Sequence, residues 1–490
     1  MLQESVINKI LSNGESKGAD FVEVYAEANL GKDFVFDNAQ LDNVSTSKSQ
    51  GAGIRVSVGS QMGFAHTGDL SERSLLAAVE SALASAKALK SFSDRGKSVE
   101  RNHKGFGPAN SQLNGEFGQD SEKELAVTED IIEKLREADE IARAMDGRVS
   151  NVSARCMTSA KTKQVVNNLG TNETSTLERT RFITQVSVSQ NGEVQNGFMA
   201  PGRTVGKEYF NLIDTKELTE IAAKRALTLL EARPAPSGQF PVILAQGAGG
   251  VLFHEACGHG LEADHILRDP SSFAGKVGQK VANEQVTLID DGTFLSNEGV
   301  GDWGTEGIDD EGYSSQRHVL IENGVLTDYM WDSLRANEQN GGDDFGGYLN
   351  SLEAGLRVGN GRRQSYKHLP MVRMTNTFVD RGELEPEDII ADTKYGIYIV
   401  DLSGGQVNTI TGDFVFGMSE AYLIEDGKIT APLKPAQLIG NGPEVLQLVD
   451  AVGNDFATWS GTCGKNGQSV PVSSGQPTLR VAKMTVGGTG

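Results

Sequence analysis

A histidine–glutamate pair followed by a second histidine is the strongest chemical feature of the chain. The stretch "HEACGHG" places His254 beside Glu255, with His259 five residues after the first histidine. Two imidazoles can hold a metal ion, and a neighbouring carboxylate can move a proton on or off water. In the common His-Glu-x-x-His arrangement, the two histidines are four residues apart on one helical face. The spacing here is one residue longer, so the backbone must accommodate it.

The longer spacing requires a local distortion of the helix if His254 and His259 are to meet. In a regular α-helix, residues five apart are rotated about 140° from each other and cannot hold one ion. A π-bulge or an unwound turn brings such a pair together, and π-bulges occur frequently at functional sites. Gly258 is expected to lower the cost of that distortion. The alternative is a hydrogen-bonded helix that holds no metal.

A catalytic zinc site uses about three protein ligands and keeps one position open. From residue types alone the third ligand stays open among several side chains of the second half. Cys463 stands out in "GTCGKNGQS", because the nearby glycines allow a close backbone approach. Cys257 is expected to pack as a small apolar side chain. The candidates are Cys257, Glu262, Asp264, His265, His318, His368 and Cys463, with Glu262 and Asp264 interpreted as supporting or structural residues.

The segments around the motif predict a buried strand followed by a buried helix. Residues 240–245 form a short apolar run that glycines end, and "VLFHEACGHG" has the apolar content of an interior helix. Just before them, "EARPAPSGQF" (231–240) combines two prolines with a serine and a glycine, which indicates a domain boundary. We therefore expect two domains, residues 1–235 and 236–490, with the metal-site helix in the second.

The first half is expected to form an α/β domain with helices on a sheet. Its helices are predicted from apolar residues at helical spacing, and its strands from alternating apolar and polar residues. Asp214, with Glu217 three positions on, is expected to open the third helix. A long loop is predicted over 92–120. The helices are predicted over 71–89, 122–145 and 216–232, and the strands over 21–28, 53–59 and 181–189.

The second half is expected to be rich in β-strands. Three similar stretches, "TLIDDGTF" (287–294), "VLIENGVL" (319–326) and "YLIEDGKI" (422–429), place Asp-Gly or Asn-Gly between apolar runs. These dipeptides supply the positive φ angles of tight hairpins. We predict a barrel- or sandwich-like domain here, so the overall fold class is α+β. The loops over 92–120 and 336–356 are expected to vary with substrate or partner.

Composition excludes some classes of function. The chain has 490 residues and a net charge of −21, which argues against a nucleic-acid binder because such proteins need a basic surface. Three sparse cysteines do not predict a disulfide framework, and they favour a reducing cytoplasm. Glu4 and Asn8 interrupt the apolar run that a signal peptide would need. The sequence contains no run of about 18 apolar residues, so no membrane span is predicted.

Two further features have competing interpretations. Arg362, Arg363 and His368 lie in "NGRRQSYKHLP" and could bind a peptide carboxylate or stabilise an oxyanion, or else form a structural ion-pair cluster. The stretch "ILAQGAGG" has the strand-and-glycine pattern of nucleotide binding, but it lacks both Gly-Lys-Ser/Thr and a full Gly-x-Gly-x-x-Gly. A metal-free scaffold that binds peptides or another subunit is the remaining alternative to an enzyme.

Several longer stretches together resemble the TldD/PmbA family of zinc-dependent proteases, and specifically its metal-bearing TldD-type subunit. They run along most of the chain and are dense in the second half. The PmbA-type partner subunit lacks the His-Glu pair, so the pair here favours the TldD type. The stretches include "FHEACGHGLEAD", "IDDEG", "NGRRQSYKHLPMVRMTNT", "GGQVNTITGDFVFGMSEAYLIEDGKI", "LIGNGPEVL" and "CGKNGQSVPVSSGQPTLRV".

The resemblance implies roles for individual residues. His254 and His259 match the family's two zinc-binding histidines, Glu255 matches its catalytic glutamate, and Cys463 matches its third ligand, a thiolate. One Zn²⁺ is therefore expected in each active subunit. The resemblance also implies an N-terminal α/β domain followed by a β-rich domain.

The resemblance further implies how the protein works. It implies that the protein, like members of the family, is cytoplasmic. It also implies a homodimer, or a heterodimer with a PmbA-type subunit, that encloses the active site. The family's substrates are peptides or unfolded polypeptide segments in extended form, and no nucleic-acid or membrane partner is expected. We predict that an extended peptide adds as a strand near the glycine-rich "LSGGQVNT" (402–409), since main-chain hydrogen bonds suit broad specificity.

Overall fold

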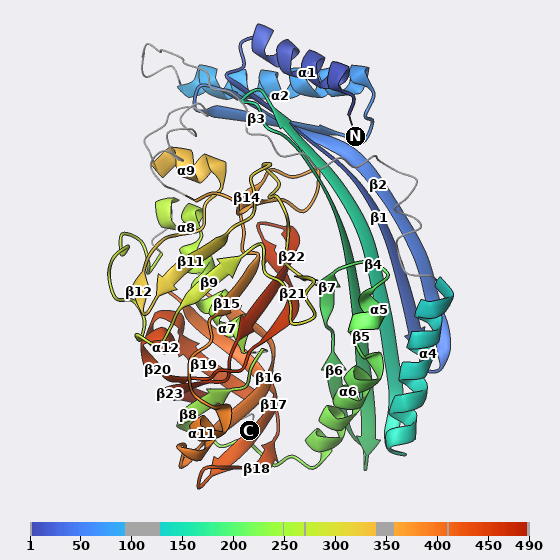
Figure 1. The fold of residues 1–490 in the computed structure, drawn as a ribbon, viewed down its shortest axis with the longest axis vertical. Coiled ribbons are helices and arrows are strands. Elements are labelled where there is room, and N and C mark those ends of the chain that lie inside the picture. Colours follow the sequence, from blue (N-terminus) through green and yellow to red (C-terminus); the bar gives the residue numbers. More distant parts are fainter. Residues whose placement is uncertain are drawn as a thin grey trace.

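A curved eight-stranded sheet organises the first half of the chain (Figure 1). The computed structural model describes residues 2–93, 128–247, 249–268, 271–339, 357–408 and 411–487. Every pairing in this sheet is antiparallel, in the order β10-β7-β5-β4-β1-β2-β3, with β6 also on β5. Its strands are β1 (Phe21–Asp37), β2 (Gln40–Val58), β3 (Gln61–Thr67), β4 (Val149–Asn167), β5 (Asn172–Gln190), β6 (Glu193–Met199), β7 (Gly202–Thr204) and β10 (Gly301–Asp302).

Helices cover the sheet at both ends, as expected for helices on a sheet. α1 (Glu4–Ser16) and α2 (Glu72–Ser93) pack on β1–β3, while α4 (Thr128–Met145) and α6 (Thr215–Leu230) pack on β4–β6. The helices predicted over 71–89 and 216–232 are present, and the one predicted over 122–145 is present from residue 128 on, since residues 122–127 lie outside the described residues. Asp214 caps α6, because its carboxylate accepts hydrogen bonds from the backbone N–H groups of Lys216 and Glu217. A short α5 (Tyr209–Leu212) precedes α6.

The predicted strands of the first half are present but longer than expected. β1 and β2 extend well beyond 21–28 and 53–59, because β1 is hydrogen-bonded between β2 and β4 as far as Asp37. The added part of β2, residues 40–50, carries exposed, mostly polar side chains that periodicity alone did not mark as strand. The predicted loop over 92–120 begins inside α2, and from residue 94 on it lies outside the described residues.

The second half is built around a closed five-stranded barrel, β16-β8-β23-β19-β17, which closes through pairing of β17 with β16. Only the β16–β8 pair is parallel. The barrel strands are β8 (Gly238–Leu244), β16 (Tyr395–Val407), β17 (Asp413–Glu425), β19 (Ala436–Asn441) and β23 (Leu479–Gly487), with β18 (Lys428–Leu433) and β20 (Val449–Val452) attached. The predicted strand over 240–245 is therefore β8.

A six-stranded mixed sheet, in the order β12-β11-β9-β15-β22-β21, lies beside the barrel. Its last strand, β21, forms a hairpin with β22. The strands are β9 (Leu288–Asp291), β11 (Arg317–Glu322), β12 (Val325–Leu326), β15 (Asn376–Val379), β21 (Ala457–Lys465) and β22 (Gln468–Gln476), with the separate pair β13 (Gly361–Arg362) and β14 (Met371–Val372). Short helices complete this half: α8 (Ala263–Arg268), α9 (Ser333–Gln339), α11 (Pro386–Ala391) and α12 (Gly442–Leu448).

Two of the three predicted hairpins are confirmed. Asn323–Gly324 joins β11 to β12, and Asp426–Gly427 joins β17 to β18, in each case with positive φ at both turn residues. The hairpin predicted over 287–294 is wrong, because β9 pairs with β11 and β15 and not with the residues that follow it. There Asp291 turns the chain by accepting hydrogen bonds from the backbone and hydroxyl of Thr293.

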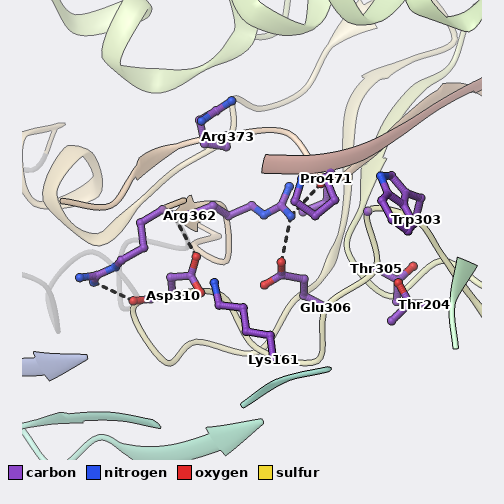
Figure 2. Close-up of polar contacts among 12 residues, drawn as sticks. Lys161, Thr204, Trp303, Thr305, Glu306, Asp310, Arg362, Arg373 and Pro471 are labelled. Atoms are coloured by element: carbon purple, nitrogen blue, oxygen red, sulfur yellow. Dashed lines mark hydrogen bonds and ion pairs between the residues drawn. The ribbon is translucent and has the colours of Figure 1, made fainter. Parts of the chain in front are cut away.

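The two halves meet through buried charges. Lys163 of β4 donates to Glu306 and Asp310, and Arg55 of β2 contacts Glu311. Figure 2 shows the centre of this junction, with Arg362 between Glu306 and Pro471. β10, from the second half, also adds to the first sheet, so the division into domains 1–235 and 236–490 stays a prediction. In the described part of the chain, none of the helices has the length and apolar character to cross a membrane.

Candidate metal centre

The segment that carries the two histidines changes helical type within twelve residues. Residues Gly250–Phe253 form a turn of α-helix (α7), His254–Gly258 form a π-helical turn, and His259–Leu261 form a 3-10 turn. The backbone N–H of His259 donates to the carbonyl of His254, which is the five-residue hydrogen bond of a π-turn. The distortion that the spacing required is therefore present.

Close packing explains the glycines around this turn. Gly258 has ordinary helical angles, with φ −55° and ψ −51°, so conformational freedom is not the reason for it. A Cβ at Gly258 would lie 2.2 Å from Met374 Sδ, and one at Gly250 would lie 2.5 Å from the backbone nitrogen of Gly475. The glycines let β22 and the segment before β15 approach the histidine-bearing turn closely, and this holds the turn against the core.

The fold brings Cys463 of β21 to the two histidines, and its separation from His259 is 204 residues of sequence. One ligand atom from each of His254, His259 and Cys463 lies within 4.8 Å of the others, and all three residues are buried. The Cys463 sulfur is 3.6 Å from His259 Nε2, and the two imidazole rings are 5.2 Å apart at an angle of 82°. Three side chains that could bind one metal ion therefore face a common point.

The donor set fits zinc. With Zn–S and Zn–N bonds of about 2.3 and 2.0 Å, a tetrahedral ion separates a sulfur and a nitrogen ligand by about 3.5 Å, close to the 3.6 Å between Cys463 and His259. Among the described residues, neither ring nitrogen of the buried His254 has a hydrogen-bond partner. Because buried polar groups normally have partners, the free nitrogens of His254 agree with a ligand role. Thiolate and imidazole ligands suit zinc.

The electrostatics of the centre favour a thiolate. Burial raises the pKa of Cys463, but the neighbouring imidazoles of His254 and His259 outweigh it and lower this pKa to about 5. The pKa of His259 is lowered by burial but raised further by Glu262 and Cys463, to well above its usual value. The charged form of the thiol, which is the form that binds metals, is thus the one that the surroundings stabilise.

Glu255 lies at the open side of the centre. Its carboxylate oxygen is 3.6 Å from His259 Nε2, and its side chain is 31% exposed, while that of His259 is 7% exposed. The carboxylate can therefore reach both the point between the ligands and incoming solvent. A group in this position is suited to exchange protons with a water molecule next to the ligands.

The other candidate ligands do not belong to this group of three side chains. Cys257 lies in the hydrophobic core, where burial raises its pKa. His318 is buried in β11, neither of its ring nitrogens has a partner in the described part of the chain, and burial lowers its pKa. Glu262, Asp264 and His265 form a second group of possible ligands beside the centre, which Lys465 joins through hydrogen bonds to both carboxylates.

Lys465 was not among the candidate residues. It stands two positions after Cys463 in a segment with strand character, so the two-residue period of a strand would have placed both side chains on the same face. Nothing in the sequence indicates that its partner is Glu262, which is 203 residues away.

The predicted substrate-binding residues lie at the junction of the two halves. Arg362 donates to Glu306 and to the carbonyls of Met374 and Pro471 (Figure 2), and Arg363 contacts Glu23 and the carbonyl of Asp310. Both are buried, which favours the structural ion-pair alternative, while His368 is partly exposed and contacts Ser365. The arginines also line a cavity of about 240 Å³ whose wall includes Thr462, next to Cys463.

Sequence comparison matches the chain along most of its length. Residues 22–86 match PmbA/TldA metallopeptidase domain 1, residues 124–230 match the central domain, and residues 237–488 match the C-terminal domain. The chain is 37% identical to the metalloprotease TldD homolog of Buchnera aphidicola, over 96% of this chain and 93% of that protein. It is 35% identical to the metalloprotease TldD homolog of Haemophilus influenzae, over 96% and 94%.

A third relative has zinc in its name. The zinc metalloprotease TldD homolog of Saccharolobus solfataricus is 31% identical over 57% of this chain and 58% of that protein. Among solved structures, TldE from Thermococcus kodakarensis superposes with a TM-score of 0.77 at 20% identity, covering 99% of this chain and 100% of that one. At that identity, the superposition establishes a shared fold.

Proposed function

Because the chain belongs to the PmbA/TldA metallopeptidase family and is a metalloprotease of the TldD type, we propose that it hydrolyses peptides or unfolded polypeptide segments with one zinc ion per subunit. The observation that carries this proposal is the convergence of His254, His259 and Cys463, whose ligand atoms lie within 4.8 Å of one another. The alternative is a metal-free scaffold that binds peptides or another subunit. The two differ in whether the purified protein contains a metal ion on which activity depends.

The roles in hydrolysis divide between the ligands and Glu255. His254, His259 and Cys463 would hold the zinc ion, which when bound supplies a Lewis acid for the scissile carbonyl and lowers the pKa of water. Glu255 accepts a proton from the attacking water and passes it to the leaving nitrogen. Its partial exposure supports this role, because it gives the carboxylate access both to substrate and to the ligands. The depressed pKa of Cys463 supports binding of zinc by a thiolate.

The substrate is proposed to bind in extended form, by adding a strand. The glycine-rich segment 402–409 includes the exposed end of β16, which beyond residue 399 pairs only with β17 among the described strands. A cavity of about 620 Å³ lies there, lined in part by Gln406, Val407 and Phe414. β21 supports the same mode, because among the described strands it pairs only with β22 and it carries Cys463. Main-chain hydrogen bonding at either strand would depend on few side chains of the substrate.

Other parts of the proposal rest on the family alone. A homodimer, or a heterodimer with a PmbA-type subunit, would enclose the active site, and a cytoplasmic location is predicted. Contacts of Arg362, Arg363 and His368 with substrate also stay a prediction. The burial of the two arginines limits such contacts to groups that enter the adjoining cavity of about 240 Å³.

The test of the proposed function is metal analysis joined to a peptidase assay. The purified protein is expected to contain about one zinc per chain, to lose cleavage of an unfolded polypeptide on chelation, and to regain it with added zinc. A protein that has no metal and still cleaves, or that neither binds zinc nor cleaves, would refute the proposal. Light scattering of the same sample measures the oligomeric state.

A further inference from the structure

A buried ion pair lies directly behind the metal centre. The Lys465 ammonium is 2.8 Å from Glu262 Oε2 and 2.8 Å from Asp264 Oδ1, and it also donates to the carbonyl of Val372. The side chain of Glu262 is fully buried and that of Lys465 is 7% exposed. Removing two charges from water is costly for each ion, so such a pair needs compensating contacts or a role.

Glu262 touches a ligand of the centre directly. The same oxygen that faces Lys465, Oε2, is 2.9 Å from His259 Nδ1. A carboxylate at this nitrogen keeps a hydrogen on Nδ1 and leaves Nε2 as the ligand atom. Nε2 is the nitrogen that faces the Cys463 sulfur, at 3.6 Å. Glu262 therefore fixes both the orientation of the ring and the nitrogen it presents.

Lys465 connects this carboxylate to the strand of the third ligand. Cys463 and Lys465 are two residues apart in β21, so their side chains lie on the same face of the strand. From that face, Cys463 reaches His259 and Lys465 reaches Glu262. The strand and the histidine-bearing turn are thus joined at two points, and one of them involves no ligand atom.

A second metal site is the competing interpretation of this cluster. Glu262, Asp264 and His265 each offer an atom within 4.8 Å of the others. The ammonium of Lys465, however, stands within hydrogen-bond distance of both carboxylates and takes the place that a cation would occupy. The negative charge of the cluster is therefore compensated by Lys465, and Glu262 also contacts His259, so the cluster serves the first centre.

We propose that Glu262 and Lys465 are positioning residues for the zinc ligands. Glu262 holds His259 in the ligating orientation, and Lys465 holds Glu262 and the Cys463 strand together. This inference rests on the proposed zinc site. Outer partners of ligating histidines commonly change metal affinity by about 10- to 100-fold when they are removed, and that loss is the expected signature.

The test compares zinc affinity, measured by chelator competition, in four variants with that of the wild-type protein. Glu262→Gln and Lys465→Met are each expected to bind zinc about 10- to 100-fold more weakly, and Lys465→Arg, which keeps the charge, is expected to recover part of the loss. Asp264→Asn is the matched control, because Asp264 shares Lys465 but makes no described contact with His259; it is expected to bind as the wild type does. Circular dichroism checks that each variant is folded.

Spectra of the cobalt-substituted proteins provide a readout that a merely structural role would not change. The thiolate-to-cobalt absorption band is expected to shift or weaken in Glu262→Gln and Lys465→Met at saturating cobalt, and to match the wild type in Asp264→Asn. Wild-type affinity and spectra in both variants would overturn the positioning roles, as would an equal loss in the control or no recovery in Lys465→Arg. A wild-type protein that binds no zinc would instead refute the proposed function.

Discussion

Replacing Lys163 by methionine is expected to destabilise the folded protein strongly at neutral pH. Lys163 extends from β4 into the junction between the two halves, where its ammonium lies 2.7 Å from Glu306 and 2.6 Å from Asp310. Its side chain is 3% exposed. Methionine preserves most of the length and apolar contact of lysine but removes the charge, so the change isolates the ion pair.

The expected decrease in the free energy of unfolding depends on which carboxylate loses its partner. Glu306 keeps Arg179 at 3.3 Å and Arg362 at 2.9 Å. The side chain of Asp310 keeps a hydrogen bond from the backbone of Arg363 and the charge interaction with Lys161, but no described ion pair. The loss therefore falls mainly on one buried charge. Leaving such a charge unpaired costs about 3–5 kcal/mol. An exposed pair such as Lys134–Glu137, in contrast, contributes about 0–1 kcal/mol.

The effect should depend on pH in a defined direction. Burial raises the pKa values of Glu306 and Asp310, but Lys163 is the largest opposing influence on each, and the net result is a pKa below the usual value for both. A lowered pKa in the folded state stabilises the fold above the unfolded-state pKa of about 4, and that stabilisation is lost as the pH falls through the folded value. The difference between the variant and the wild type should thus shrink below about pH 4.

Urea unfolding, followed by circular dichroism and tryptophan fluorescence, measures this difference. Lys163→Met is compared with the wild type at neutral and acidic pH, and Lys134→Met serves as the matched surface control. A decrease of less than about 1 kcal/mol in the free energy of unfolding at neutral pH is the size expected for a surface ion pair, and it would refute the reasoning. A loss of the same size at neutral and acidic pH would attribute the effect to packing instead of charge.

The remaining predictions concern the proposed chemistry. Glu255→Gln should retain bound zinc but lose about 10²- to 10⁴-fold in turnover, because the amide cannot accept the proton of water; near wild-type cleavage, with zinc content measured on the same sample, would remove Glu255 from this role. Cys463→Ala should lose or greatly weaken zinc binding and Cys257→Ala should keep it, since only the first sulfur faces the histidines; metal analysis giving the reverse order would identify the wrong cysteine. An unfolded polypeptide should be cleaved much faster than its stably folded form, because a compact protein offers few free strand-like segments; equal rates by gel electrophoresis, under conditions where the folded form stays closed, would contradict strand addition.

Local features of the sequence were sufficient to predict several local features of the structure. The five-residue spacing of His254 and His259 predicted a distorted helix because helical geometry leaves few other ways for the two rings to meet. Asn323–Gly324 and Asp426–Gly427 predicted tight hairpins because these dipeptides tolerate the positive φ angles that such turns need. In each case the cause lies within a few residues of the chain, and the α+β class followed from the same kind of local pattern.

Contacts between distant segments were decided by the tertiary structure. From its neighbours in sequence, Cys463 was one of seven possible third ligands, and only the resemblance to the family selected it. The reason is that β21 meets the histidine-bearing turn only through the packing of a six-stranded sheet beside a barrel. The same holds for Glu262 and Lys465, and for Arg362 and Arg363, whose burial no local pattern reveals. A side chain's chemistry is a property of its residue type, but its partner is set by three-dimensional packing, and packing joined positions more than 200 residues apart.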